Sequence, residues 1–100
     1  MTAPAYQPAV HALIKATLRT GYNVEAIRSR SRQRSLAAAR MALMHVLRQR
    51  FPLLSNGELA VIFERDATTI WTATHKAAKR IETDSAFAAM CKYLGEAVAA

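Results

Sequence analysis

Residues 63–76, FERDATTIWTATHK, combine an acid, two adjacent threonines and a helix-forming run. Asp66 can accept hydrogen bonds from the free backbone N–H groups of a first helical turn, and its charge suits the positive end of a helix. Thr68 and Thr69 would then lie in that turn, where short side chains can donate to, accept from or touch the edge of a DNA base. The stretch therefore predicts a helix that begins at Asp66 and has a polar edge suited to the major groove.

The rest of this helix separates a buried side from a polar and cationic one. Ile70, Ala77 and Ile81 recur at helical spacing and predict a buried side that extends to about Thr83. The other side carries Thr68, Thr69, Thr72, His75, Lys76 and Lys79. Long cations farther along the helix would face backbone phosphates, which they bind without reading the base sequence.

A shorter helix is expected just before this one. The segment SNGELAVIF offers Ser55 or Asn56 as a helix cap and then an apolar run, and the chain breaks at residues 64–65. Two helices joined by a tight turn form a helix-turn-helix pattern. The alternative is a generic amphipathic helix in a bundle, with no role in reading DNA.

The positive charge is strong and unevenly distributed. Fourteen Lys and Arg against seven Asp and Glu give a net charge of +7 and a pI near 10.3. No acidic residue occurs between Glu25 and Glu58, whereas this interval contains Arg28, Arg30, Arg32, Arg34, Arg40, Arg48 and Arg50. A concentration of one sign favours contact with nucleic acid, and binding to a membrane surface is the main competing interpretation.

Helical signals also dominate the rest of the chain, because good helix formers fill the intervals between only three Gly and three Pro residues. We expect a first helix from near Pro8 to before Gly21, with Val10, Leu13, Ile14 and Leu18 buried. A short helix is expected at 24–28, a long one from a cap at Ser35 to before Pro52, and a last one from about Ser85. No apolar residue occurs from Ser29 to Ser35, so this basic tract is expected to be an exposed loop. The fold class is therefore all-α: one domain over residues 1–100, a small bundle of five to six helices, with flexible ends at 1–7 and 96–100.

Catalysis and cofactor binding are not expected. His11, His45 and His75 fall on separate predicted helices without a Cys or carboxylate at metal-ligand spacing. No nucleophile elbow, paired carboxylates or glycine-rich phosphate loop occurs, so we expect no enzyme activity, metal, cofactor or small-molecule substrate. The lone Cys91, together with an N-terminus that lacks a secretion signal, predicts a cytoplasmic location and no membrane partner.

The stretch GELAVIFERDATTIWTATHKAAKRI resembles the signature of the C-terminal DNA-binding domain of the bacterial replication initiator DnaA. The upstream part, GYNVEAIRSRSRQRSLAAARMALMHVLRQR, is similar to that domain's short helix, basic loop and long helix in the same order. The resemblance covers about residues 10–94. It implies a helix-turn-helix protein that binds double-stranded DNA and is associated with the nucleoid.

The resemblance also implies roles for single residues. Arg32 falls where the family inserts an arginine into the minor groove, and Ser35, Arg40 and Arg48 fall on contacts to the DNA backbone. In the family the aspartate matched by Asp66 accepts a hydrogen bond from a base. The full set of expected DNA-binding residues is Arg32, Arg34, Ser35, Arg40, Arg48, Asp66, Ala67, Thr68, Thr69, Thr72 and Lys76.

The sequence departs from the family pattern at several places. Ala67 stands where the family usually has a groove-facing His, and the alanine side chain could at most touch a thymine methyl group. The turn FERD is one residue shorter than the family's turn and lacks its two glycines. Trp71 replaces a smaller aliphatic residue and is expected to be a core or interface aromatic. The chain has no nucleotide-binding loop and no room for the initiator's ATPase, so it could not melt an origin alone.

Three functions remain open at this point. The first is a sequence-specific regulator of transcription that binds promoter DNA and recruits a partner protein. The second is a replication-linked factor, from a phage or another mobile element, that binds the initiator's boxes. The third is a protein-interaction module whose apolar face around Trp71 and Phe87 docks a partner.

Overall fold

Local capping residues determine where most helices begin. Asn23 and Asp84 accept hydrogen bonds from the backbone N–H groups of Ala26 and Phe87, at 2.7 Å and 3.0 Å. Ser55 forms a capping box with Glu58, in which each side chain accepts from the other residue's backbone N–H. Short polar side chains at these points satisfy amides that have no partner inside the helix.

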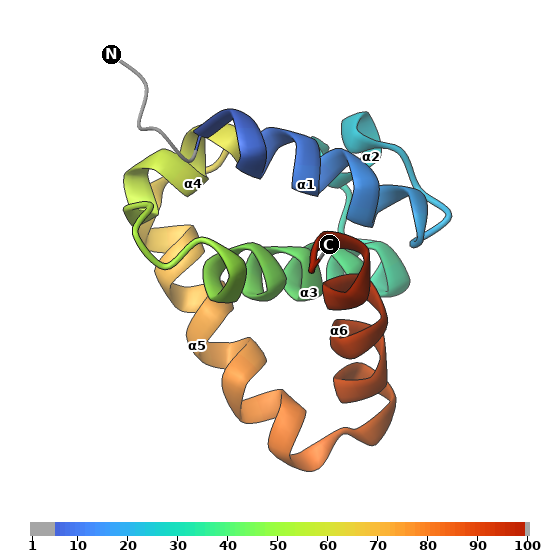
Figure 1. Ribbon diagram of the computed structural model, residues 1–100. Helices are drawn as coiled ribbons and strands as arrows, with labels where there is room; N and C mark the ends of the chain where they lie inside the picture. The colour runs from blue at the N-terminus through green and yellow to red at the C-terminus, as the bar shows by residue number, and fades with distance from the viewer. Residues whose placement is uncertain (1–5, 100) are drawn as a thin grey trace.

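The computed structural model describes residues 6–99, which form six helices and no strand (Figure 1). The helices are α1 (Tyr6–Leu18), α2 (Val24–Arg28), α3 (Arg34–Arg50), α4 (Asn56–Phe63), α5 (Ala67–Thr83) and α6 (Ser85–Val98). The predicted all-α bundle is therefore confirmed. The short helix at 24–28 and the end of α5 at Thr83 lie where the sequence predicted them.

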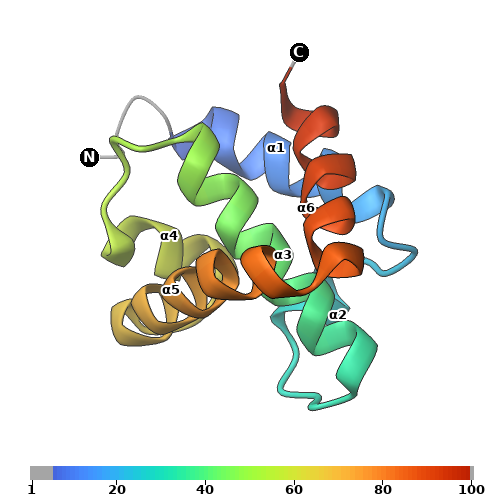
Figure 2. The ribbon, with the colours of Figure 1, turned by 90° about the horizontal axis from the view of Figure 1, so that it is seen from below.

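The helix α3 lies at the centre of the fold. It packs against α5 and α6 and also contacts α1, α2 and α4, and Figure 2 shows it crossing between α5 and α6. Leu43 and Leu47 are fully buried on α3, and Ile70 of α5 and Leu94 of α6 are buried in the same core. The core thus fixes α5 relative to α3.

The first helix buries only part of the set of residues expected. Ile14 is 46% exposed and Leu18 76% exposed, whereas Leu13 is buried together with Ala9, Ala12, Ala16 and Thr17. Small residues let α1 approach α3 and α6 closely, with which it packs. The prediction is therefore confirmed for Leu13 and wrong for Ile14 and Leu18, while Val10 is partly buried against the core.

The chain ends are more regular than expected where they are described. Tyr6 and Gln7 already belong to α1, and Glu96, Ala97 and Val98 continue α6. Val98 is 7% exposed, and its carbonyl accepts a hydrogen bond from Arg50 Nε at 3.1 Å. Of the ends expected to be flexible, residues 1–5 and Ala100 lie outside the described part of the chain.

The start of α3 differs from the prediction by two residues. Gln33 is the N-cap and makes no capping hydrogen bond with its side chain, whereas Ser35 lies in the first helical turn. The Ser35 hydroxyl instead pairs with the Tyr22 hydroxyl at 2.6 Å. Ser35 is thus not a helix cap, because a tertiary contact takes its side chain.

The helices α4 and α5 are consecutive and pack against each other. Glu64 ends α4 with φ 55 and ψ 48, in the left-handed region that favours glycine. The backbone N–H of Arg65 returns to the Ala60 carbonyl at 2.9 Å, which closes the turn. Asp66 then caps α5 as predicted.

Candidate nucleic-acid interface

The first turn of α5 presents a polar edge to solvent. The Thr69 backbone N–H donates to Asp66 Oδ1 at 2.7 Å, and hydrogen bonds from Thr69 hold the pKa of Asp66 below its ordinary value. Ala67 and Thr68 are exposed. The helix start is therefore built as predicted, with Asp66 in the cap and small side chains available to a ligand.

A shallow hollow of about 330 Å³ lies beside this edge, between α5 and α3. It is lined by Asp66, Thr68, Thr69, Thr72, Lys76, Ala73 and Met41. Five of these residues belong to the predicted DNA-binding set. Met41 comes from α3 and was not predicted, because only the packing of α3 against α5 brings its side chain to this place.

The basic loop, residues 29–33, connects α2 to α3. Arg30 and Arg32 of the loop are exposed, as is Arg34 at the start of α3. The ion pairs found among residues 6–99 use other arginines: Arg19, Arg28 and Arg80. In Figure 2 the loop and α5 lie along the same lower side of the molecule. The basic loop and α5 therefore lie on one side of the fold.

Electrostatic effects also place Arg30 near the start of α5. Burial lowers the pKa of Arg65, and the charge of Arg30 lowers it further. The Asp66 carboxylate feels the same positive charge, as a smaller effect than its hydrogen bonds to Thr69. Arg30 was not in the predicted set, although its place in the arginine-rich tract was a signal for it.

Arg40 and Arg48 do not extend freely into solvent. Arg40 is half-buried and donates three hydrogen bonds to backbone carbonyls of residues 27–31. Arg48 is half-buried as well, and donates to Asn56 Oδ1 at 2.8 Å and to carbonyls of residues 51–54. Both guanidinium groups therefore serve the fold, which the sequence resemblance did not indicate.

Trp71 and His75 form an exposed pair on α5. Their ring centroids are 4.0 Å apart, and His75 Nδ1–H donates to the Trp71 carbonyl at 2.8 Å. Trp71 is 54% exposed, so it is not the core residue that was one of its two expected roles. Phe87 is 2% exposed beneath the Arg80 guanidinium, 4.5 Å from its ring centroid, and does not share a surface with Trp71.

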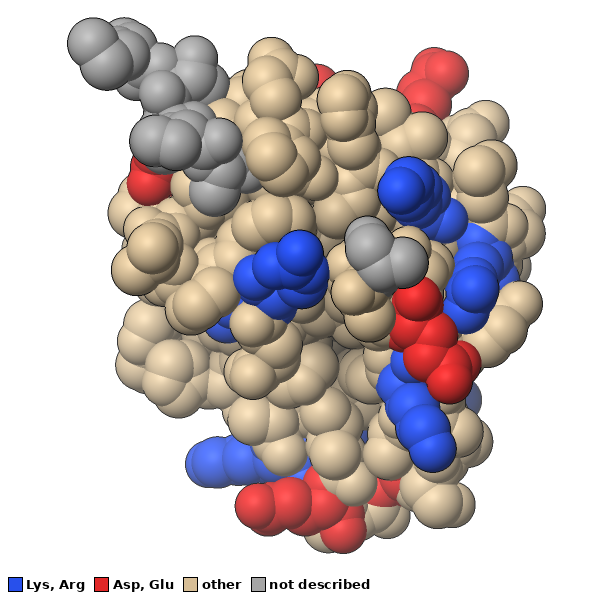
Figure 3. Space-filling view, viewed as in Figure 1, with Lys and Arg blue, Asp and Glu red and all other residues tan. Residues whose placement is uncertain are grey.

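The face of the molecule seen in Figure 3 has a different character. Lys and Arg side chains form small separate groups there, Asp and Glu lie close to some of them, and other residues cover most of the area. The basic loop lies behind α3 in this orientation. The mixed signs on this face resemble an ordinary solvated surface.

Known proteins give no guide to the family. The sequence matches no protein-family model, and no curated protein is significantly similar to it. The interpretation of the interface therefore depends on its own residues and geometry.

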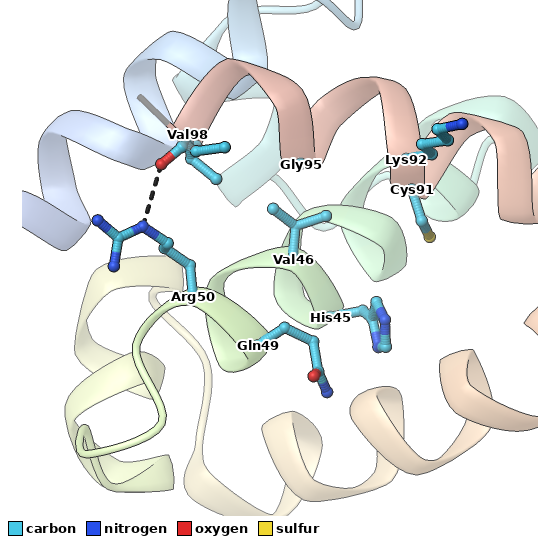
Figure 4. Close-up of a pocket in the computed structure, with 9 residues that line it drawn as sticks. His45, Val46, Gln49, Arg50, Cys91, Lys92, Gly95 and Val98 are labelled. Carbon is cyan, nitrogen blue, oxygen red and sulfur yellow. Dashed lines mark hydrogen bonds between the residues drawn. The ribbon is translucent and has the colours of Figure 1, made fainter.

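A second hollow, of about 360 Å³, lies between α3 and α6 (Figure 4). Cys91 and His45 line it, and burial raises the pKa of the Cys91 thiol to about 11 and lowers the pKa of His45. At neutral pH the thiol is protonated and the imidazole is mostly neutral, so neither group is an activated nucleophile or a charged binding group. Within residues 6–99 no three His, Cys, Asp or Glu side chains are grouped to hold a metal ion.

None of the helices within residues 6–99 is both long and apolar enough to span a bilayer.

The lowered pKa of Asp66 predicts that part of the protein's stability is lost in acid through this carboxylate. Because its folded pKa lies below the ordinary value of 3.8, its contribution to stability is present above that value and is lost as the pH falls through the folded pKa. Asn retains the capping acceptor but does not titrate. We expect the melting temperature of Asp66→Asn to fall less than that of the wild type between about pH 5 and about pH 2, as measured by circular dichroism.

The matched control for this experiment is Glu82→Gln, which alters an exposed carboxylate near the other end of α5. Its acid-induced loss of melting temperature should equal that of the wild type. An equal loss in Asp66→Asn would contradict the assigned role of the Asp66 carboxylate.

Proposed function

We propose that this chain is a sequence-specific double-stranded DNA-binding protein that regulates transcription from promoter DNA. The observation that carries the proposal is the placement of two chemically different elements on one side of the fold. A threonine edge begins α5, and exposed Arg30, Arg32 and Arg34 lie on the loop and helix start beside it. One element suits a major groove and the other an adjacent, narrow minor groove.

Each part of the interface has a chemical role in this proposal. Thr68 and Thr72 are short hydroxyl side chains that can reach base edges from a helix lying in the major groove. Lys76 lies one turn farther along and binds a backbone phosphate as a point charge. Arg32 enters the minor groove, where a narrow width concentrates negative potential.

A domain of this size presents a small reading surface, which fits a factor that marks a site and recruits a partner of the transcription machinery. A replication-linked factor that binds the initiator's boxes is the second candidate. Ala67, in the position of the family's groove-facing histidine, favours a different site preference from the initiator's.

The two candidates are separated by competition in a gel-shift assay. Duplexes are first selected from a random pool by the full chain, and the labelled selected duplex is then challenged with an initiator box or with random DNA. If the box competes no better than random DNA, the regulator is supported. If the box competes as well as the selected duplex, the replication-linked candidate replaces it.

The interaction-module alternative is less well supported. Its proposed surface needs Trp71 and Phe87 together, but Phe87 is buried. Failure to bind any duplex at low salt would nevertheless revive it, because clustered arginines and a net charge of +7 should give at least non-specific affinity.

The central test compares a base-reading residue with a phosphate-binding one. Thr68→Ala should reduce discrimination between the selected duplex and single-base variants by about 1–3 kcal/mol at the contacted base pair. Lys76→Ala should weaken all duplexes alike and lower the slope of log K against log salt by about 1. Fluorescence anisotropy titrations at several salt concentrations measure both quantities.

Two control variants match these changes. Thr83→Ala makes the same deletion at the far end of α5, and Lys92→Ala removes an exposed lysine of α6. Neither should alter sequence discrimination. If Thr68→Ala and Lys76→Ala weakened all duplexes by the same factor, the assignment of α5 as the recognition helix would be wrong.

A further inference from the structure

Two guanidinium groups, those of Arg40 and Arg65, bind backbone carbonyls where the basic loop leaves α2. Arg40 of α3 donates from Nε to the Ile27 carbonyl at 2.7 Å and from Nη2 to the Ser29 carbonyl at 3.0 Å. Its Nη1 also reaches the Ser31 carbonyl at 3.3 Å. One side chain of the central helix therefore binds both the end of α2 and the middle of the loop.

Arg65 reaches the same segment from the turn between α4 and α5. Its Nη1 donates to the Arg28 carbonyl at 2.9 Å, and its Nη2 donates to the Ser29 carbonyl, which Arg40 also binds. Arg28 completes the connection in the opposite direction, because its Nε donates to the Ile62 carbonyl of α4 at 2.9 Å. The loop and the turn before α5 are thus joined by hydrogen bonds in both directions.

Apart from these arginines, the loop is anchored mainly at its two ends, where Ser29 Oγ donates to the Ala26 carbonyl at 2.7 Å and the Gln33 carbonyl accepts from the Ala37 N–H at 2.8 Å. Its residues 29–33 are all polar, so apolar packing does not fix its backbone. The hydrogen bonds within it, from Ser31 N–H to Ser29 Oγ at 3.4 Å and from Gln33 N–H to Ser31 Oγ at 3.3 Å, are long. Its conformation therefore depends largely on the arginines that bind its carbonyls.

This arrangement places cations close together at an energetic cost. Burial lowers the pKa of Arg40 and of Arg65, and the charge of Arg65 lowers the pKa of Arg40 further. A planar guanidinium can bind two carbonyls with fixed geometry, which a lysine ammonium cannot reproduce. Arg40 and Arg65 thus add positive charge beside a loop that already carries Arg30 and Arg32.

We propose that Arg40 and Arg65 are positioning residues that fix the basic loop relative to the first turn of α5, so that loop and helix meet DNA as one preorganised unit. The expected effect on DNA affinity rests on the proposed DNA-binding function. The loop is held before binding, so less conformational freedom is lost when its arginines contact DNA. Arg40, expected as a DNA contact, thereby acts through the loop.

The first experiment needs no DNA. Trypsin cuts after Arg30 and Arg32, and the cleavage rate in the free, full chain is followed by mass spectrometry. Arg65→Lys keeps the charge and the number of trypsin sites but loses the two-carbonyl fork. We expect cleavage in the loop to accelerate severalfold in Arg65→Lys and in Arg40→Lys. Arg50→Lys, which loses a single hydrogen bond to Val98, is the matched control and should leave the loop rate unchanged.

The circular dichroism spectrum and melting curve of each variant show whether it is folded. Arg40→Lys and Arg65→Lys alter the same carbonyl cluster from α3 and from the turn before α5, so either folded variant is a sufficient test. An unchanged cleavage rate in a folded variant would overturn the positioning role, whether or not the chain binds DNA. Faster cleavage without any duplex binding would keep the positioning role and refute the proposed function instead.

The second experiment is a double-mutant cycle in DNA affinity. Arg65→Lys should weaken binding roughly tenfold in the wild-type background, and should have no effect when Arg30 and Arg32 are already alanine. A direct phosphate contact by Arg65 would behave differently, because lysine would keep most of the affinity and any loss would be the same in both backgrounds. Equal losses in both backgrounds would therefore overturn the proposal.

Discussion

Simultaneous replacement of Arg30, Arg32 and Arg34 with alanine is expected to lower the slope of log K against log salt by about 2 to 3. At low salt the same change should weaken duplex binding by a hundredfold or more, on the order of 3 kcal/mol. The three side chains are exposed, so their cations are available to phosphates and the minor groove. Their removal should leave the fold intact, because they lie outside the core. Anisotropy titrations over a range of salt concentrations measure the effect.

A control with the same loss of charge separates local contact from net charge. Lys15, Arg50 and Lys92 line the hollows between α1, α3 and α6, away from the basic loop. Their replacement with alanine lowers the net charge of +7 by the same three units. This variant should keep most of the slope. If both triple variants lost the same slope, the basic loop would have no special place in the interface.

Phe63→Ala is expected to destabilise the fold by about 3–5 kcal/mol, the largest effect on stability that we predict. Phe63 is fully buried at the end of α4, next to the turn that leads into α5. Its removal leaves a cavity that the surrounding side chains cannot fill completely. Since small domains are stable by only about 5–15 kcal/mol, the variant should be partly unfolded at moderate temperature. Urea denaturation followed by circular dichroism gives the free energy of unfolding.

Val61→Ala on the same helix is the matched control, because Val61 is 62% exposed. Its cost should stay within about 0.5 kcal/mol. A cost below about 1 kcal/mol for Phe63→Ala would show that the end of α4 does not depend on this core contact. The comparison also establishes how strongly the position of α5 depends on packing rather than on its own cap.

The cap of α3 and the buried face of α1 could not be predicted from local sequence preferences alone. Ser35 was expected to cap α3, but the Tyr22 hydroxyl takes its side chain and Gln33 occupies the cap. Ile14 and Leu18 are apolar but exposed, because α1 packs through small residues. In both cases a contact between distant segments overrides a correct local preference.

The sequence by itself determined the helical class, a cap at Ser55 or Asn56, the cap at Asp66, and the threonine edge at the start of α5. These features are local: a cap and its amides lie within a few residues, and helical spacing repeats along one segment. Only the tertiary structure decided what the arginines do. Arg65 binds the Ser29 carbonyl across 36 residues, and Arg40 binds three carbonyls around the loop. A long cation can reach either solvent or a backbone carbonyl, and the choice depends on which carbonyls the packed helices bring within hydrogen-bonding distance.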